Sequence, residues 1–284
     1  MASGHDQPPS LIHMTDRFSF RAGRWRATVV LCAVLAAAGC AGKKNTIPEN
    51  ITQPDRYLLD RADQELKKKH WADAREYYRQ VVDNYPQSPI RPDAKLGMGE
   101  TYLGEGSTES LVLGANEFRE FLTFYPTNPK ADLAQFRLAM CHQKQMRAPE
   151  RDQTETRESL KEYQAFFDRY PNSPLMPEVR AKWREARDRL SMSSYQIGVH
   201  YYRSKWYPGA VDRFREVLKE DPEFTGRDGV YFFLAESLLR GDGSPDKKNG
   251  KAQAIPYLER LLAEFAESEF LEDAKKRLAL LNAQ

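Results

Sequence analysis

The chain has 284 residues, of which 40% are hydrophobic and 30% are charged, which is enough for one elongated body or two small cores. Its formal net charge is +2, and residues 1–39 contribute four arginines against two acids. The remaining body is therefore neutral, and it lacks the basic excess that non-specific nucleic-acid binding requires. Composition thus excludes an ordinary nucleic-acid-binding domain, and no nucleic-acid partner is expected.

The N-terminal segment has the pattern of an export signal. Three arginines precede a 12-residue apolar run at 27–38. As a helix this run would reach about 18 Å, short of the ~30 Å hydrocarbon core, so it predicts a cleavable signal peptide over residues 1–39 rather than a membrane span. Met14 is an alternative start that leaves a leader of conventional length.

The leader ends in Ala37-Ala38-Gly39-Cys40, which resembles a bacterial lipobox, although leucine is commonest at the first of these positions. We therefore expect lipidation at Cys40; the alternative is an ordinary signal peptide with an incidental cysteine. Residues 40–54 are polar and contain no apolar period, which indicates a flexible tether. Ala41 stands where an aspartate would retain enterobacterial lipoproteins in the inner membrane, so outer-membrane sorting is favoured.

An internal repeat fills the chain from residue 55 onward. Each copy is an amphipathic run that ends at an anchor, usually Tyr-Pro, with a small residue twelve positions before it, a large residue eight before and an apolar residue four before. The anchors are Pro86, Pro126, Pro171, Pro222 and Ala266. Positions i, i+4 and i+8 lie on one helical stripe, and proline ends the helix. Each copy therefore predicts a helix, a stop and a second helix.

The first helix of the first copy is expected at Tyr57–His70. The predicted second helices follow the anchors at Asp93–Leu103, Ala131–Gln145, Val179–Ser204, Gly229–Arg240 and Glu269–Asn282. The anchors lie 40 to 51 residues apart, and the unit resembles the 34-residue tetratricopeptide repeat enlarged by loops. The expected fold class is all-α, an α-solenoid of about five tetratricopeptide-like helix pairs.

Three stretches go beyond a generic repeat array: Arg151-Asp152-Gln153-Thr154 followed by Arg169-Tyr170-Pro171-Asn172-Ser173-Pro174, then Gly198-Val199-His200-Tyr201-Tyr202-Arg203, then Ala210-Val211-Asp212-Arg213-Phe214. In this order, after a lipobox, they resemble the BamD (YfiO) family over roughly residues 55–284. The fourth anchor is Asp-Pro rather than Tyr-Pro, and the fifth lacks proline, so the resemblance is weaker toward the C-terminus.

The resemblance implies a non-catalytic lipoprotein of the outer-membrane β-barrel assembly machinery, anchored by lipid on the periplasmic face of the outer membrane. Its implied partners are the POTRA domains of the barrel subunit, other assembly lipoproteins and unfolded outer-membrane proteins. Repeats at 55–175 would form the substrate groove and repeats at 176–284 the partner-binding part. The competing hypothesis is a tetratricopeptide envelope lipoprotein of the cell-division or Tol-associated type.

Candidate binding residues come from aromatic pairs and from the resemblance. Adjacent tyrosines such as Tyr77-Tyr78 and Tyr201-Tyr202 are not expected to face one core stripe together, so one of each pair is expected in a groove. We assign Tyr77 and Tyr102 to the substrate groove. The partner-binding residues are expected to be Arg213, Tyr202 and Trp206. The alternative for the aromatic residues is the core, and for Arg213 a surface ion pair within the array.

The sequence contains no motif that indicates an enzyme. The chain contains no GxxxxGK[ST], HExxH, GxSxG or CxxC pattern, and the histidines of the body are scattered singly. Cys141 and His142 are adjacent, but a structural zinc site needs four ligands. Beyond the leader and Cys40, Cys141 stands alone, so no internal disulfide is expected. We expect no enzyme activity, no cofactor and no metal.

Overall fold

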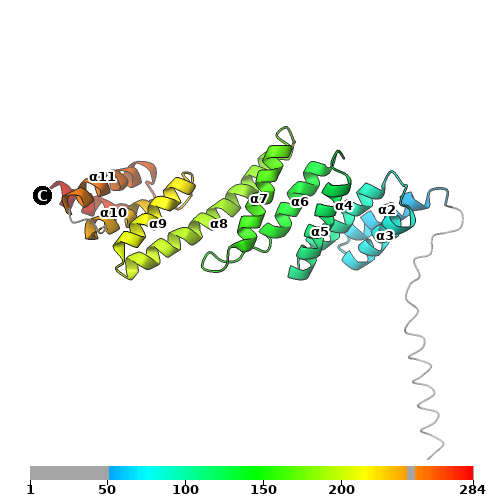
Figure 1. The fold of residues 1–284 in the computed structure, drawn as a ribbon, viewed down its shortest axis with the longest axis horizontal. Coiled ribbons are helices and arrows are strands. Elements are labelled where there is room, and N and C mark those ends of the chain that lie inside the picture. The colour runs from blue at the N-terminus through cyan, green and yellow to red at the C-terminus, as the bar shows by residue number, and fades with distance from the viewer. Residues whose placement is uncertain (1–50, 242–246, 284) are drawn as a thin grey trace, which may run out of the picture. The chain divides into compact units, whose positions relative to one another are not determined.

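The computed structural model describes residues 51–241 and 247–283, so the signal peptide and Cys40 lie outside the described residues. In the described part every regular element is a helix (Figure 1). The helices are α2 (Pro54–Lys67), α3 (Trp71–Asn84), α4 (Arg91–Glu105), α5 (Thr108–Phe124), α6 (Ala131–Gln143), α7 (Thr154–Arg169), α8 (Met176–Arg203), α9 (Tyr207–Glu220), α10 (Arg227–Arg240), α11 (Lys247–Glu264) and α12 (Leu271–Asn282). The expectation of an all-α fold is confirmed.

Each helix packs against its neighbours in chain order, which gives a solenoid-like stack of pairs α2/α3, α4/α5, α6/α7, α8/α9 and α10/α11, followed by α12. These helices belong to one unit, Thr52–Gln284. The division of the repeats at 175/176 therefore stays a prediction. Within the described ranges, no helix combines the length and the apolar character that crossing a membrane requires.

The repeated stripe forms the core, with one correction. The small residue of each copy and the large residue four positions later are all buried, as expected. The third fully buried position lies five residues before the anchor, at Val81, Phe121, Phe166, Val217 and Leu261. The residues four before the anchor are only half-buried. The stripe therefore follows i, i+4, i+7, because seven residues return closer to the same side of a 3.6-residue helix than eight do.

In three copies, a glycine lets the large aromatic ring approach the neighbouring helix. A Cβ at Gly99 would lie 2.6 Å from Cε1 of Phe118, and one at Gly198 would lie 2.5 Å from Cε1 of Phe214. No real Cβ tolerates such contacts, so α4 and α8 carry glycine where the rings of α5 and α9 press against their backbones. The same packing explains the glycine pair of α4, because Gly97 receives the ring of Tyr78 from the other side.

The turns after three of the five anchors share one hydrogen bond. Ser88 donates to Asp55 (Oγ to Oδ2, 2.7 Å), and two later serines make the same bond. These are Ser173 to Asp132 at 2.6 Å and Ser268 to Asp228 at 2.7 Å. In each case the aspartate lies in the first turn of the preceding helix pair, where a carboxylate also suits the helix dipole. The serine after the anchor thus ties the end of a pair to its own beginning.

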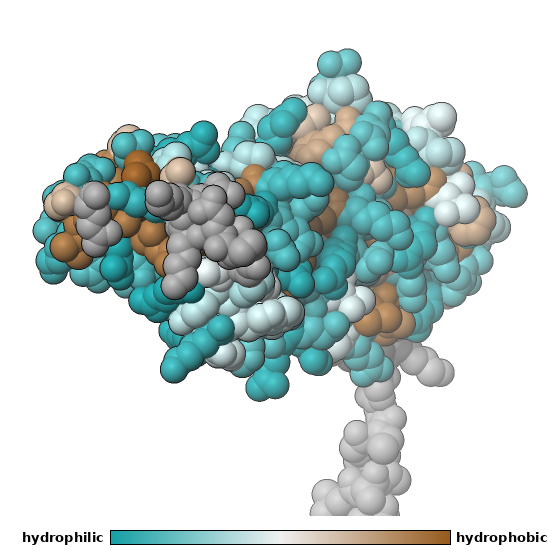
Figure 2. All heavy atoms as spheres, turned by 60° about the vertical axis from the view of Figure 1, so that its left-hand side comes forward, coloured by the Kyte–Doolittle hydropathy of each residue, from teal (hydrophilic) through white to brown (hydrophobic). Residues whose placement is uncertain are grey.

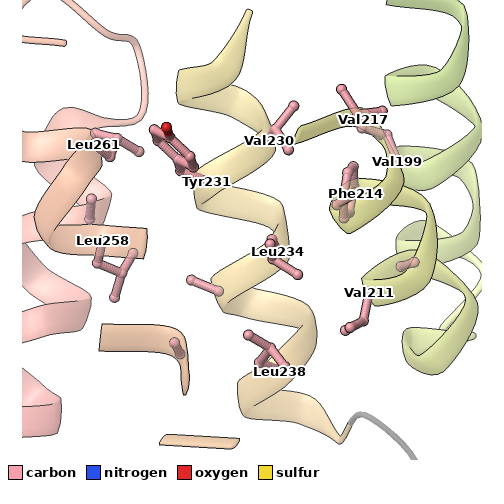
Figure 3. Packing of buried hydrophobic residues seen from close by; sticks show 14 of the residues in the cluster. Val199, Val211, Phe214, Val217, Val230, Tyr231, Leu234, Leu238, Leu258 and Leu261 are labelled. Atoms are coloured by element: carbon pink, nitrogen blue, oxygen red, sulfur yellow. The ribbon is translucent and has the colours of Figure 1, made fainter. Parts of the chain in front are cut away.

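Helix α8 explains the longest anchor spacing. It has 28 residues and extends about 42 Å. Val179 and Ala186, in its first half, belong to the core with Tyr163 and Phe166 of α7. Val199, in its second half, belongs to the C-terminal core (Figure 3). The helix predicted at Val179–Ser204 is confirmed to within three residues at each end, so the extra length of this copy is helix rather than loop.

Candidate partner-binding site

Arg213 lies on α9, one residue before the buried Phe214. Its side chain is 32% exposed, and its Nη1 lies 2.8 Å from Oε2 of Glu216 on the same helix. The residue therefore points away from the core, as the helical period predicts. Arg213 also forms the surface ion pair that was the alternative expectation, with Glu216 as its partner.

Arg213 lines a hollow of about 250 Å³ between α7, α8 and α9. Two further arginines share this lining: Arg157 from α7 and Arg187 from α8. Glu216 and Glu220 of α9 lie at the same hollow, so three guanidinium groups face two carboxylates. The sequence indicated neither Arg157 nor Arg187, because their convergence depends on how three separate helices pack.

A buried ion-pair network supports this hollow. Asp221 is 3% exposed and accepts hydrogen bonds from Arg184, one of them 2.9 Å from Nη1 to Oδ1, and from Ser191. Arg184 also contacts Asp188 at 2.9 Å. Burial acts to raise the pKa of Asp221, but hydrogen bonds from Arg184 and Ser191 outweigh it and hold this pKa below its usual value. The Asp-Pro departure at the fourth anchor thus clamps α9 to α8.

The other two predicted partner residues lie in different surroundings. Tyr202 is half-buried: its ring centroid is 5.1 Å from that of Phe233, and Cζ of Arg240 lies 4.9 Å from it. Burial raises its pKa. Trp206 is 54% exposed, with one side against Gly209 and its ring 4.5 Å, edge-on, from Tyr201. Tyr202 therefore stabilises the C-terminal packing, whereas Trp206 presents a firmly held apolar face to solvent.

The two residues assigned to the substrate groove are more covered than expected. Tyr77 is 9% exposed, and Tyr78 beside it is also buried, so the expectation that only one of the pair would be buried is wrong. Cζ of Arg61 lies 5.7 Å from the ring of Tyr77, and Cζ of Arg75 lies 4.6 Å from that of Tyr102. A role in a groove stays a prediction for both residues; Tyr102, which is half-buried, retains more of the surface that such a role needs.

The Arg151–Thr154 stretch shapes the loop between α6 and α7. Gln153 is 4% exposed and donates from Nε2 to the carbonyls of Ala148 (2.8 Å) and Arg151 (3.0 Å). Its Oε1 accepts from Thr156 at 2.8 Å, so the amide is fully used inside the loop. The loop lies against α8, where Gln196 donates to Glu150 at 2.7 Å. This motif therefore has a structural explanation.

One trio among the described residues has the composition of a metal site. Single ligand atoms of Glu65, His70 and Asp73 lie within 4.8 Å of one another at the α2–α3 turn. Glu65, however, already contacts Lys68 at 2.8 Å and Nδ1 of His70 at 2.7 Å. The carboxylate is thus neutralised by side chains, which favours an ion-pair cluster over a cation site.

The surface is mostly hydrophilic on the face shown in Figure 2, with brown apolar residues in separate small groups. Exposed large apolar side chains are few among the described residues and stand on several helices; they include Val112, Leu113, Phe124, Ile197, Trp206 and Leu280. Recognition on such a surface depends mainly on charged and polar contacts with a few apolar anchors.

Comparison with known proteins identifies relatives of this chain. The chain is 29% identical over 231 residues to the outer membrane protein assembly factor BamD of Caulobacter vibrioides, covering 79% of this chain and 74% of that protein. It is 22% identical to the protein of that name from Vibrio cholerae, covering 68% of this chain and 82% of that one. A solved tetratricopeptide repeat protein from Parabacteroides merdae aligns with 81% of this chain and 73% of its own, at 13% identity and a TM-score of 0.34. Residues 52–227, more than half of the chain, match the family model described as YfiO, outer membrane lipoprotein, and the chain therefore belongs to this family.

Proposed function

We propose that this protein is a non-catalytic scaffold of the outer-membrane β-barrel assembly machinery, anchored by a lipid on Cys40 at the periplasmic face of the outer membrane. Membership of an outer membrane lipoprotein family supports this, as do relatives named as outer membrane protein assembly factors. A rigid stack of helix pairs suits a scaffold, because each pair contacts only its neighbours and leaves extended faces for partners.

The scaffold binds the POTRA domains of the barrel subunit through the C-terminal repeats, and the hollow that contains Arg213 is the observation that carries this proposal. An arginine there offers a planar fork of N–H donors, which matches a carboxylate on the partner. Its present partner, Glu216, is 55% exposed, so their surface ion pair is weak and easily exchanged. Trp206 adds an apolar anchor on the same C-terminal repeats.

Unfolded outer-membrane proteins are the second class of proposed partner, along the N-terminal repeats near Tyr102, and other assembly lipoproteins are the third. Both assignments are supported by family membership alone. An experiment that separates them from the barrel subunit is crosslinking from a photoreactive residue placed at Tyr102, followed by identification of the attached protein.

The principal test is co-purification from detergent-solubilised outer membranes. The tagged full-length protein should recover a large β-barrel with POTRA domains, and Arg213→Glu should reduce that recovery about tenfold or more, since reversing one charge of a close pair costs several kcal/mol. Arg215→Glu is the matched control, because Arg215 lies on the same helix, is exposed and is outside the hollow. Recovery of division or Tol-associated proteins instead would support the competing function.

Lipid attachment is tested separately. Mass spectrometry of the mature N-terminal peptide should find an acylated Cys40, and Cys40→Ala should leave the precursor unprocessed. A mature chain that retains Gly39, or that begins at an unmodified residue, would contradict the proposed anchor.

A further inference from the structure

The hollow between α7, α8 and α9 lies where the core cluster that contains Phe166 meets the one that contains Phe214. The first half of α8 packs with Phe166 of α7, and its second half packs with Phe214 of α9. The extra turns of α8 therefore separate α7 from α9 along its length, and the hollow lies beside these turns. A ligand here would touch helices from both sides of the junction.

The arginines of this hollow have unequal partners. Arg157 of α7 is exposed and forms no close ion pair among the described residues, although its charge acts on Asp152. Arg187 lies 3.9 Å from Glu220 and 4.0 Å from Asp221, whose carboxylate is already held by Arg184. Arg213 has only the exposed Glu216. Each guanidinium carries five N–H donors, so the three groups retain donor capacity toward the hollow.

The size of the hollow limits its occupant. About 250 Å³ accommodates one or two side chains rather than a folded element. Guanidinium groups from separate helices converge best on a planar oxyanion, and a carboxylate can accept from more than one of them.

We propose that an acidic side chain of the barrel subunit's POTRA region enters this hollow and is held by Arg157 together with Arg213. The partner then spans α8 and contacts α7 as well as α9. Arg157 is thus a second specificity-determining residue, on a helix outside the C-terminal repeats. This inference rests on the proposed function, since it names where and how the same partner binds.

The test measures binding of the purified POTRA region of the organism's own barrel subunit to the full-length protein in detergent. Arg157→Glu should raise Kd about tenfold, equivalent to ~1.4 kcal/mol. Arg157→Gln should raise it less, because it removes the charge without adding repulsion. The matched control Arg215→Glu should leave Kd within twofold, although it makes the same change in net charge.

The salt dependence provides a second readout. Binding by the wild type should weaken as NaCl rises from 50 to 500 mM, and the Arg157→Gln variant should weaken less steeply, because one screened interaction has been removed. If the wild type binds the POTRA region but Arg157→Glu and Arg157→Gln match Arg215→Glu, the inference fails and the proposed function stands. If the wild type itself shows no binding, the proposed function fails.

Discussion

The buried ion pair between Asp221, at the end of α9, and Arg184 of α8 gives the most specific stability prediction. Replacing Asp221 with asparagine preserves the shape of the side chain but removes the negative charge of its carboxylate. The oxygens of that carboxylate accept hydrogen bonds from Arg184 and Ser191. Asp221 is 3% exposed, whereas the side chain of Arg184 is 24% exposed and keeps Asp188 as a partner. Breaking a fully buried pair costs about 3–5 kcal/mol, and the partial exposure of Arg184 reduces the expected loss to about 2–3 kcal/mol.

The measurement is thermal unfolding of the full-length protein followed by circular dichroism. A loss of this size should lower Tm by about 5–10 °C for a body of this length. The matched control is Asp212→Asn, which changes an exposed aspartate of the same helix and should alter stability by no more than about 0.5 kcal/mol. Equal melting temperatures for the two variants would refute the clamp.

The pH dependence supplies an independent check of the same reasoning. The folded-state pKa of Asp221 lies below its usual value, so the unfolded chain takes up a proton at higher pH than the folded chain does. The stabilisation is therefore fully present above the unfolded pKa of about 3.9 and is lost as pH falls through the lowered folded value. The difference in stability between wild type and Asp221→Asn should be constant from pH 7 to pH 5 and should shrink only below about pH 4.

Two further changes test the packing. Phe118→Ala should destabilise the protein by about 3–5 kcal/mol because the ring is fully buried. The control is Phe124→Ala, at a ring that is 66% exposed, which should cost less than about 1 kcal/mol. Urea unfolding of both variants measures the difference. Gly198→Ala should cost about 1–3 kcal/mol, since the new methyl group would meet the ring of Phe214; a melting temperature equal to that of the wild type would show that α8 and α9 separate without penalty.

Local patterning was sufficient for the helices and their repeat. Every copy has a small residue followed by a large residue about one helical turn later, as in Ala210 and Phe214. A proline ends the first helix of most copies. These signals are local, because helical period and proline geometry depend only on nearby residues. They predicted the all-α fold and the buried positions twelve and eight before each anchor, and the motifs after the leader indicated the family.

The details of burial and of the candidate site depended on tertiary packing. Tyr77 is buried beside Tyr78 because α3 packs against both α2 and α4, so more than one stripe of α3 is covered. Arg157 and Arg213 line one hollow because α7 and α9 both pack against the long helix α8. Such contacts join residues far apart in the chain, and their geometry is set by three packed helices rather than by any local pattern.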